Sequence, residues 1–344
     1  MKQLLNTLYV STEGAWLRLE GETLVVMIEK DKRLQVPLHH LGGIVCIGRV
    51  NLSNMLMARC MEDGRSIVWL SENGRFQARV EGAVSGNILL RQAQFRAADD
   101  PDLVLTLAKS FIAGKLRNSR QVLLRSARDS RDESDANSLR AAADGLAVNL
   151  RNLEYAGDLD RVRGLEGDAA RIYFERMTLM LRPATRKDFA FSGRTRRPPR
   201  DPLNALLSFL YALLLTDCRS ALESVGLDSQ LGFLHAVRPG RHALALDLLE
   251  EFRCVLGDRL ALTLVNRAQI NRKDFEFNPG GSVLLNDEGR KKVIVAYQER
   301  KKDQLVHPVL AQKVEVGLLP LLQARFLARY LRGDLEAYIP YLHK

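Results

Sequence analysis

Three acidic or imidazole side chains in separate segments have the clearest potential for chemistry: Glu166, His235 and Asp247. Glycines lie close to Glu166 on both sides and two alanines follow it, so a bulky ligand could approach its carboxylate. Glu250 lies three residues after Asp247 on an expected helix, which places both carboxylates on one face. Because like charges repel there, a divalent cation would stabilise the pair. Carboxylate oxygens with one imidazole form a ligand set that suits Mg²⁺ or Mn²⁺.

Such a metal site would suit phosphoryl transfer. The ion polarises a scissile phosphate and helps to deprotonate a water molecule or a sugar hydroxyl, so no nucleophilic side chain is needed. The sequence contains no serine nucleophile elbow, P-loop, His-Glu-x-x-His pair or dinucleotide-binding fingerprint. Ordinary structural interpretations remain open: Glu166 as a first-turn carboxylate, His235 as a core histidine, and the two helical carboxylates as a solvated face. Spacing alone favours these ordinary interpretations.

The densest basic stretch runs from Arg182 to Arg200, where seven basic residues stand against the single acidic Asp188. A flexible arm of this composition could neutralise DNA phosphates while its two phenylalanines stack on splayed bases, and a solvated loop is the alternative. The helix expected over residues 102–128 carries further basic residues that could touch the DNA backbone. The candidate DNA contacts are Lys115, Arg120, Arg186, Lys187, Phe189, Phe191, Arg194, Arg196, Arg197 and Arg241.

Short apolar stretches that favour strands dominate the first 95 residues. These stretches are residues 4–10, 16–19, 23–28, 34–36, 43–47, 66–70 and 76–80. Residues 29–32 would join two of the strands as a hairpin. Residues 53–64 predict one helix with a serine cap and a glycine stop. We therefore expect residues 1–95 to form a β-rich N-terminal domain.

From about residue 96 onward, helical patterns replace the strands. Asp100 and Pro101 supply a cap and a first-turn proline for a helix that runs to about residue 128, and Asp201 with Pro202 repeats the signal. Further helices are expected at residues 138–156, 160–181, 202–216, 242–268, 288–302 and 309–331, and the polar residues 128–135 predict a mobile loop. The expected fold class is α+β, with a larger all-α C-terminal domain over residues 96–344 that carries the candidate site.

The composition is that of a folded protein with a basic surface. Hydrophobic residues make up 46% and charged residues 27% of the 344. The net charge is +10 and the isoelectric point is near 9.6, which favours a polyanionic partner. Residues 96–344 hold 40 basic and 32 acidic side chains, so the helical part carries most of the excess. The four cysteines are scattered without metal-ligand spacing.

The apolar runs of the sequence predict no membrane span. The longest, residues 205–216, is shorter than the ~20 residues that cross a bilayer. The N-terminus lacks the apolar core and the small-residue cleavage site of a signal peptide. We expect a cytoplasmic location.

Taken together, these segments resemble the CRISPR-associated spacer integrase family, often called Cas-one. The resemblance covers nearly the whole chain, and its motifs follow the family order: residues 69–76, 166–174, 204–211, 232–235, 241–253 and 287–292. It implies that Glu166, His235 and Asp247 are the catalytic, metal-binding residues. Glu250 falls on a further acidic position that is often Asp in relatives, and we include it among the candidate metal ligands.

The resemblance also implies an activity and partners. Members form homodimers, with the β-rich domain on the dimer and partner side, and assemble with a small protein, Cas-two, in the prokaryotic cytoplasm. Their reaction is transesterification: a 3′ hydroxyl of double-stranded DNA with single-stranded 3′ ends attacks a phosphodiester of a CRISPR repeat. Two alternatives remain: a metal-dependent DNA nuclease without integration, which the same residues would support, and a non-catalytic DNA-binding subunit, for which the basic arm alone would suffice.

Overall fold

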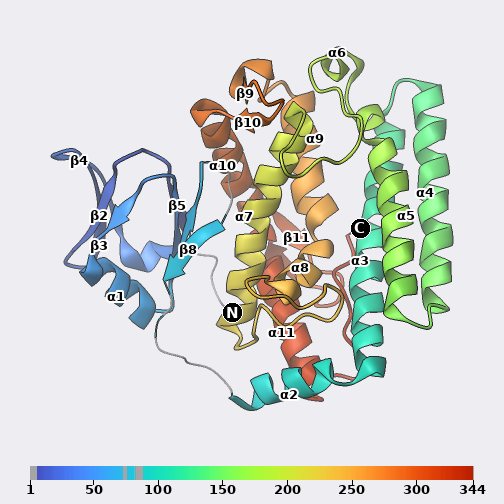
Figure 1. Cartoon of the computed structure of the whole chain (residues 1–344), viewed down its shortest axis with the longest axis horizontal. Helices are drawn as coiled ribbons and strands as arrows, with labels where there is room; N and C mark the ends of the chain where they lie inside the picture. Colours follow the sequence, from blue (N-terminus) through green and yellow to red (C-terminus); the bar gives the residue numbers. More distant parts are fainter. Residues whose placement is uncertain (1–5, 73–75, 81, 83–87, 344) are drawn as a thin grey trace.

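The computed structural model describes residues 6–72, 76–80, 82 and 88–343. It comprises a β-rich N-terminal part and a larger part made mostly of helices, which lie side by side in Figure 1. The expected α+β class is therefore confirmed, with strands first and helices after them.

Two four-stranded sheets form the β-rich part. One sheet has the order β1-β5-β7-β8, with β1 (Asn6–Val10), β5 (Leu41–Ile47), β7 (Ser66–Leu70) and β8 (Phe76–Val80). The other has the order β4-β3-β2-β6, with β4 (Asp31–Pro37), β3 (Thr23–Ile28), β2 (Trp16–Glu20) and β6 (Asn51–Leu52). The predicted hairpin joins β3 to β4, and Glu29 adopts a positive φ of 56° in its turn. The predicted helix is α1 (Asn54–Glu62), capped by the Ser53 hydroxyl, which accepts a hydrogen bond from Leu56 N at 3.3 Å.

Alternation along β5 and β7 lets one sheet serve two cores. Ile44 and Cys46 face a small core within the β-rich part, whereas Val45 and Ile47 belong to the large core of the helical part. Val68 and Leu70 of β7 also belong to the large core of the helical part. Because successive strand residues point to opposite faces, the sheet is buried on both sides and fixes the β-rich part against the helices.

The helical part contains ten α-helices in the described residues. These are α2 (Ile88–Ala98), α3 (Pro101–Asp129), α4 (Glu133–Glu154), α5 (Leu159–Glu175), α6 (Pro183–Arg186), α7 (Pro202–Ser224), α8 (Ala243–Glu250), α9 (Arg259–Asn266), α10 (Asp287–Lys302) and α11 (Leu319–Leu331). Asp100 caps α3 by accepting hydrogen bonds from Asp102 N and Leu103 N, and Asp201 caps α7, as the sequence predicts.

Several predicted boundaries in this part are wrong. The helix expected over residues 242–268 is interrupted by a π-helical segment, Arg253–Asp258, where Gly257 packs so closely on Tyr211 that a Cβ atom would lie 2.8 Å from its ring. The expected loop 128–135 is mostly helical, because Asp132 caps α4 through Asp135 N at 3.0 Å. The helix expected from residue 309 begins at residue 319.

Two short hairpins in the helical part are absent from the sequence-based prediction. One pairs β9 (Phe275–Phe277) with β10 (Val283–Leu285), and the other pairs β11 (Gln304–Val306) with β12 (Lys313–Glu315). Each strand has only three residues, which is too short for an alternating pattern to stand out.

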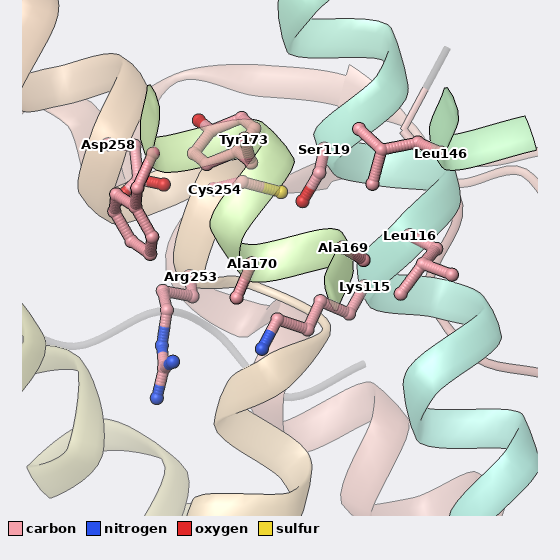
Figure 2. Close-up of a pocket in the computed structure, with 11 residues that line it drawn as sticks. Lys115, Leu116, Ser119, Leu146, Ala169, Ala170, Tyr173, Arg253, Cys254 and Asp258 are labelled. Atoms are coloured by element: carbon pink, nitrogen blue, oxygen red, sulfur yellow. The ribbon is translucent and has the colours of Figure 1, made fainter. Parts of the chain in front are cut away.

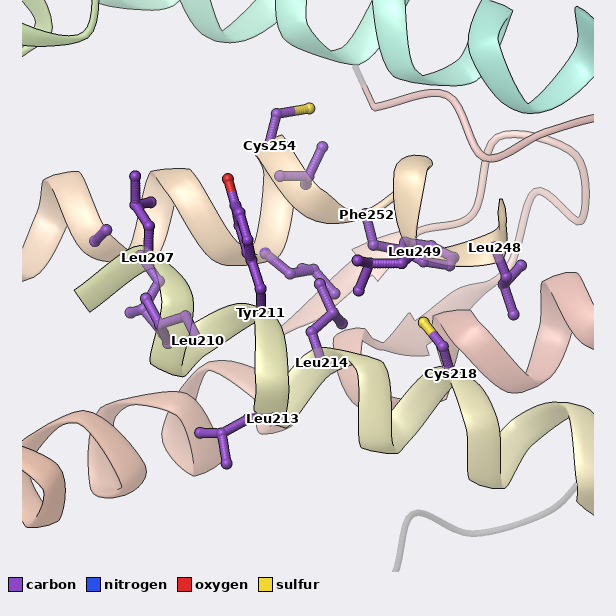
Figure 3. Close-up of a cluster of buried hydrophobic side chains, with 14 of the residues drawn as sticks. Leu207, Leu210, Tyr211, Leu213, Leu214, Cys218, Leu248, Leu249, Phe252 and Cys254 are labelled. Atoms are coloured by element: carbon purple, nitrogen blue, oxygen red, sulfur yellow. The ribbon is translucent and has the colours of Figure 1, made fainter. Parts of the chain in front are cut away.

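The helix α7 is the one described helix that is long and apolar enough to cross a membrane. In this fold, 61% of its most apolar window is buried inside the protein. Leu207, Leu210 and Leu214 pack with Leu249 and Phe252 in the large core, as Figure 3 shows. Its apolar composition is therefore explained by its central place among the helices.

Candidate active site

Helices α5 and α8 and the loop before α8 bring the predicted site residues to one region. Glu166 lies on α5, His235 in the loop, and Asp247 and Glu250 on α8. The long helix α3 packs against both α5 and α8 and thereby holds them next to each other. A Cβ atom at Gly164 or Gly167 would meet no atom within 4 Å, which agrees with the open surroundings expected for Glu166.

Asp247 is fully buried, and its carboxylate organises the loop that carries His235. Oδ2 accepts hydrogen bonds from Phe233 N at 2.6 Å and Leu234 N at 3.0 Å. Oδ1 accepts from His235 N at 2.9 Å and lies 2.7 Å from His235 Nδ1. Both carboxylate oxygens are thus occupied by this loop, whereas His235 Nε2 has no hydrogen-bond partner in the described part of the chain.

Gly232 permits this close approach of loop and helix. A Cβ atom there would lie 2.6 Å from the backbone carbon of Ala243 and 2.7 Å from Asp247 Oδ2. Any side chain would push the loop away from α8, so the loop needs glycine at this position.

Glu250 is buried beside two positive charges. Its Oε1 lies 2.8 Å from Arg253 Nη2 and its Oε2 lies 2.8 Å from Lys115 Nζ. Burial alone would raise the pKa of Glu250, but the positive charges of Arg253 and Lys115, with a contribution from His235, outweigh it and hold the pKa at about 2. Glu250 is therefore ionised at neutral pH.

Lys115 joins the two carboxylates that come from different helices. Its ammonium forms ion pairs with Glu166 on α5 and with Glu250 on α8. Only 7% of Lys115 is exposed, and Glu250 Oε2 has no hydrogen bond of suitable direction despite its contact with the ammonium. Glu166 and Glu250 therefore converge on one cation position.

The side chains at this site are of the types that bind divalent metal ions, but Lys115 stands between two of them. No group of three or more His, Cys, Asp or Glu side chains is gathered at ligand spacing among the described residues. The two convergent carboxylates, the incompletely bonded Oε2 of Glu250 and the open Nε2 of His235 nevertheless supply the oxygen and nitrogen ligands that Mg²⁺ and Mn²⁺ accept.

A cluster of polar side chains packs next to Arg253 of this site. Arg253 and Arg194 both stack on the ring of Tyr211, at 5.0 Å and 5.3 Å from its centroid. The Tyr211 hydroxyl donates to Asp258, and burial raises the pKa of Asp258 to about 6. Lys115 and Arg253 line a small cavity of about 20 Å³ and extend toward the same side of it in Figure 2.

Four of the predicted DNA contacts are not free surface residues. Lys115 is held by the two carboxylates, and Phe189 is buried edge-on against Phe275 at 5.8 Å. Arg194 donates to Asn204 Oδ1 at 2.6 Å and to Ser208 Oγ at 3.0 Å. Arg186 forms an ion pair with Asp135 and also donates to Leu181 O at 3.0 Å. The arm expected over residues 182–200 is therefore not wholly free, because buried Phe189 and the hydrogen bonds of half-buried Arg186 and Arg194 hold it against the helices.

The other predicted contacts remain accessible to different degrees. Lys187, Arg196 and Arg197 are exposed. Arg120, Phe191 and Arg241 are half-buried, and Phe191 lies 6.1 Å from the Phe174 ring. Sequence-based reasoning missed Arg253, although its place three residues after Glu250 on a helical pattern was a usable signal.

Comparison with known proteins identifies close relatives of this chain. A family model described as CRISPR associated protein Cas1 matches residues 8–299. The chain is 52% identical to CRISPR-associated endonuclease Cas1 1 of Moorella thermoacetica, over 100% of both sequences.

Solved structures share the fold at lower identity. A casposase bound to an integration product matches with a TM-score of 0.84 and 22% identity, over 99% of this chain and 95% of that one. A Cas6-RT-Cas1–Cas2 complex matches with a TM-score of 0.83 and 22% identity, over 99% of this chain and 36% of the other. At such identity these two structures establish the fold only.

Proposed function

The chain belongs to the Cas1 family of CRISPR-associated proteins, and we propose that it is a divalent-metal-dependent DNA endonuclease and integrase of CRISPR adaptation. The observation that carries this proposal is the convergence of Glu166 and Glu250, from two helices, on one cation position next to His235. The full-length similarity to a Cas1 endonuclease supports the nuclease chemistry, and the shared fold with a casposase bound to an integration product supports joining.

We assign the metal ligands as Glu166, His235 through Nε2, and Glu250. When bound, Mg²⁺ or Mn²⁺ would polarise a phosphate oxygen and lower the pKa of an attacking hydroxyl. Asp247 has a different role from the one predicted by the resemblance. Because its oxygens accept from the loop amides and from His235 Nδ1, it fixes the ring orientation and leaves Nε2 as the ligand atom.

The reaction that fits this site is transesterification. The 3′ oxygen of the incoming DNA forms a bond to phosphorus, and the bond from phosphorus to a sugar oxygen of the CRISPR repeat breaks and leaves a hydroxyl. Water in place of the 3′ hydroxyl gives the nuclease reaction. Arg253 remains beside the site as a buried positive charge that offsets the carboxylates.

The partners proposed are DNA with single-stranded 3′ ends, repeat DNA, a second copy of this chain and the small protein Cas2. A chain of the Cas6-RT-Cas1–Cas2 complex contains a part with the same fold as this chain, which supports the proposal of Cas2 as a partner. Exposed Lys187, Arg196 and Arg197 supply positive charge for the DNA.

The test is a joining assay with the partner protein, a plasmid carrying a repeat, and short duplex DNA. We expect Glu166→Ala and Glu250→Ala to abolish joining and cutting, while DNA binding measured without divalent metal stays within about twofold of wild type. Cutting without any joining would support the nuclease alternative. Unchanged reactions in both variants would support the non-catalytic subunit.

A further inference from the structure

Lys115 occupies the place between the two carboxylates that the proposed metal would need. Its side chain comes from α3, while Glu166 and Glu250 come from α5 and α8. The ammonium is buried, so it does not lie on a DNA-facing surface. An ammonium and a divalent ion cannot share these oxygens closely, because two positive charges in a partly buried site repel strongly.

The charges around this position are already balanced without another ion. Glu166 and Glu250 contribute two negative charges, and Lys115 and Arg253 contribute two positive ones. Asp247 is satisfied separately by the loop amides. A divalent ion added to this cluster therefore leaves a positive excess, which an anionic phosphodiester would offset.

Lys115 is better able to move than Arg253. The guanidinium of Arg253 is fixed by Glu250 on one side and by the Tyr211 ring on the other. Lys115 has a flexible four-carbon stem, and the Glu166 side chain that it contacts is 31% exposed, so the ammonium has a route toward solvent.

We propose that Lys115 competes with the divalent metal for Glu166 and Glu250, and that its displacement couples metal binding to DNA binding. The inference rests on the proposed metal site. Metal entry releases the Lys115 ammonium next to the reacting phosphate, where it forms an ion pair with a phosphodiester oxygen. DNA therefore strengthens metal binding, and by thermodynamic reciprocity metal strengthens DNA binding by the same factor.

The experiment measures Mn²⁺ affinity by titration calorimetry, with and without saturating short duplex DNA. In wild type we expect DNA to tighten Mn²⁺ binding about tenfold, a size typical of coupled sites. In Lys115→Met we expect Mn²⁺ alone to bind about tenfold more tightly than in wild type, and DNA to change that affinity less than twofold. The matched control is Lys109→Met on the same helix, whose ammonium contacts Glu154 O at 3.1 Å, and it should behave as wild type.

Two further measurements keep the test valid if Lys115→Met folds poorly. One is the Mn²⁺ affinity of Lys115→Arg, and the other is the Tm of Lys115→Met with and without Mn²⁺. Lys115→Arg keeps the positive charge, so it should keep the weak Mn²⁺ affinity of wild type. In Lys115→Met two carboxylates lack their shared cation, so Mn²⁺ should raise its Tm more than that of wild type. An equal or weaker Mn²⁺ affinity in Lys115→Met, or no extra rise in Tm, overturns the inference.

Glu250→Gln separates this inference from the proposed function. If the metal site is correct, Glu250→Gln weakens Mn²⁺ binding at least tenfold in every background. If Glu250→Gln leaves Mn²⁺ affinity unchanged, the proposed metal site fails, and the inference fails with it. If Glu250→Gln weakens binding but Lys115→Met does not strengthen it, only the competition by Lys115 is refuted.

Discussion

His235 Nδ1 lies 2.7 Å from Asp247 Oδ1, and the same carboxylate accepts three backbone N–H groups of the loop that carries the histidine. One buried side chain on α8 thus sets both the path of this loop and the orientation of the imidazole. Neutral imidazole binds metals through the nitrogen that carries no proton, so a proton held on Nδ1 leaves Nε2 free for that role.

The first prediction concerns this orienting carboxylate. Asp247→Asn replaces one acceptor oxygen by an NH₂ group. This group is a donor and would face the N–H donors of the loop, so the loop and the His235 ring lose their fixed position. We expect Mn²⁺ affinity and the joining rate to fall about 10- to 100-fold, as for other residues that orient metal ligands. Asp168→Asn is the control, because Asp168 pairs with Arg171 and accepts a hydrogen bond from Asn149 of α4 at 2.8 Å rather than contacting the loop that carries His235. Wild-type affinity in Asp247→Asn would contradict the role assigned to Asp247.

The second prediction concerns Gly232. Gly232→Ala introduces a methyl group where 2.6 Å separates its position from Ala243, so the loop must shift away from α8. We expect joining activity to fall at least tenfold, and because the neighbouring Phe233 and Leu234 belong to the large core, we expect the Tm to fall as well. Gly240→Ala is a useful comparison, because its added Cβ meets no atom within 4 Å although its φ is +73°. Equal activity of Gly232→Ala and wild type would show that the loop tolerates the shift.

The third prediction concerns the C-terminal tail, which packs against Glu251 at the end of α8. Glu251 is fully buried and accepts hydrogen bonds from Tyr341 N at 2.7 Å and Gln323 Nε2 at 3.0 Å, and from the Tyr338 hydroxyl. Glu251→Ala leaves these donors without an acceptor, which costs about 2–4 kcal/mol of the free energy of unfolding. Urea denaturation measures this loss, and the exposed Glu336→Ala should cost less than about 0.5 kcal/mol. Equal effects of the two substitutions would refute the anchoring role.

The fourth prediction separates two kinds of arginine in the predicted arm. Arg196→Ala with Arg197→Ala should weaken DNA binding and lower the slope of log K against log salt by about 1 for each phosphate that is no longer neutralised, without a change in Tm. Arg194→Ala should lower stability by about 1–3 kcal/mol, because Asn204 Oδ1 and Ser208 Oγ lose a charged donor. An unchanged salt slope in the double variant would show that the exposed pair does not contact phosphate.

The fifth prediction concerns pH. Burial and the charges of Arg219 and Arg79, only partly offset by Glu223 and Asp228, lower the pKa of His242 to about 4. The folded protein therefore holds this histidine neutral, while the unfolded chain takes up a proton near pH 6.5. Its contribution to stability is present above about pH 6.5 and is lost as the pH falls toward 4.

His242→Asn should remove this part of the acid sensitivity. The amide can replace the ring Nδ1, which lies 3.0 Å from Ser229 Oγ, but it does not titrate. The difference in the free energy of unfolding between pH 7 and pH 4.5 should shrink by on the order of 1 kcal/mol, allowing for solvent screening at this half-buried position. Identical pH profiles of variant and wild type would contradict the prediction.

The sequence alone determined the local features of this fold. Asp100 with Pro101 and Asp201 with Pro202 start helices because a cap and a fixed φ act within one turn. Alternating apolar residues such as those of β5 and β7 define strands for the same local reason. The types of side chain that can bind a divalent ion were also evident, since Glu166, His235 and the two carboxylates of α8 stand in segments that match the family motifs.

Only the tertiary structure decided which groups each carboxylate contacts. Asp247 and Glu250 share a helix face by spacing, but the loop before α8 folds its backbone amides onto Asp247 and leaves Glu250 to meet Glu166. Lys115 is 51 residues from Glu166 in sequence, so no local pattern could show that its ammonium joins the two. These contacts are hydrogen bonds and ion pairs between segments that are distant in sequence. They form because buried polar groups need partners, and only the packed chain determines which partners are near.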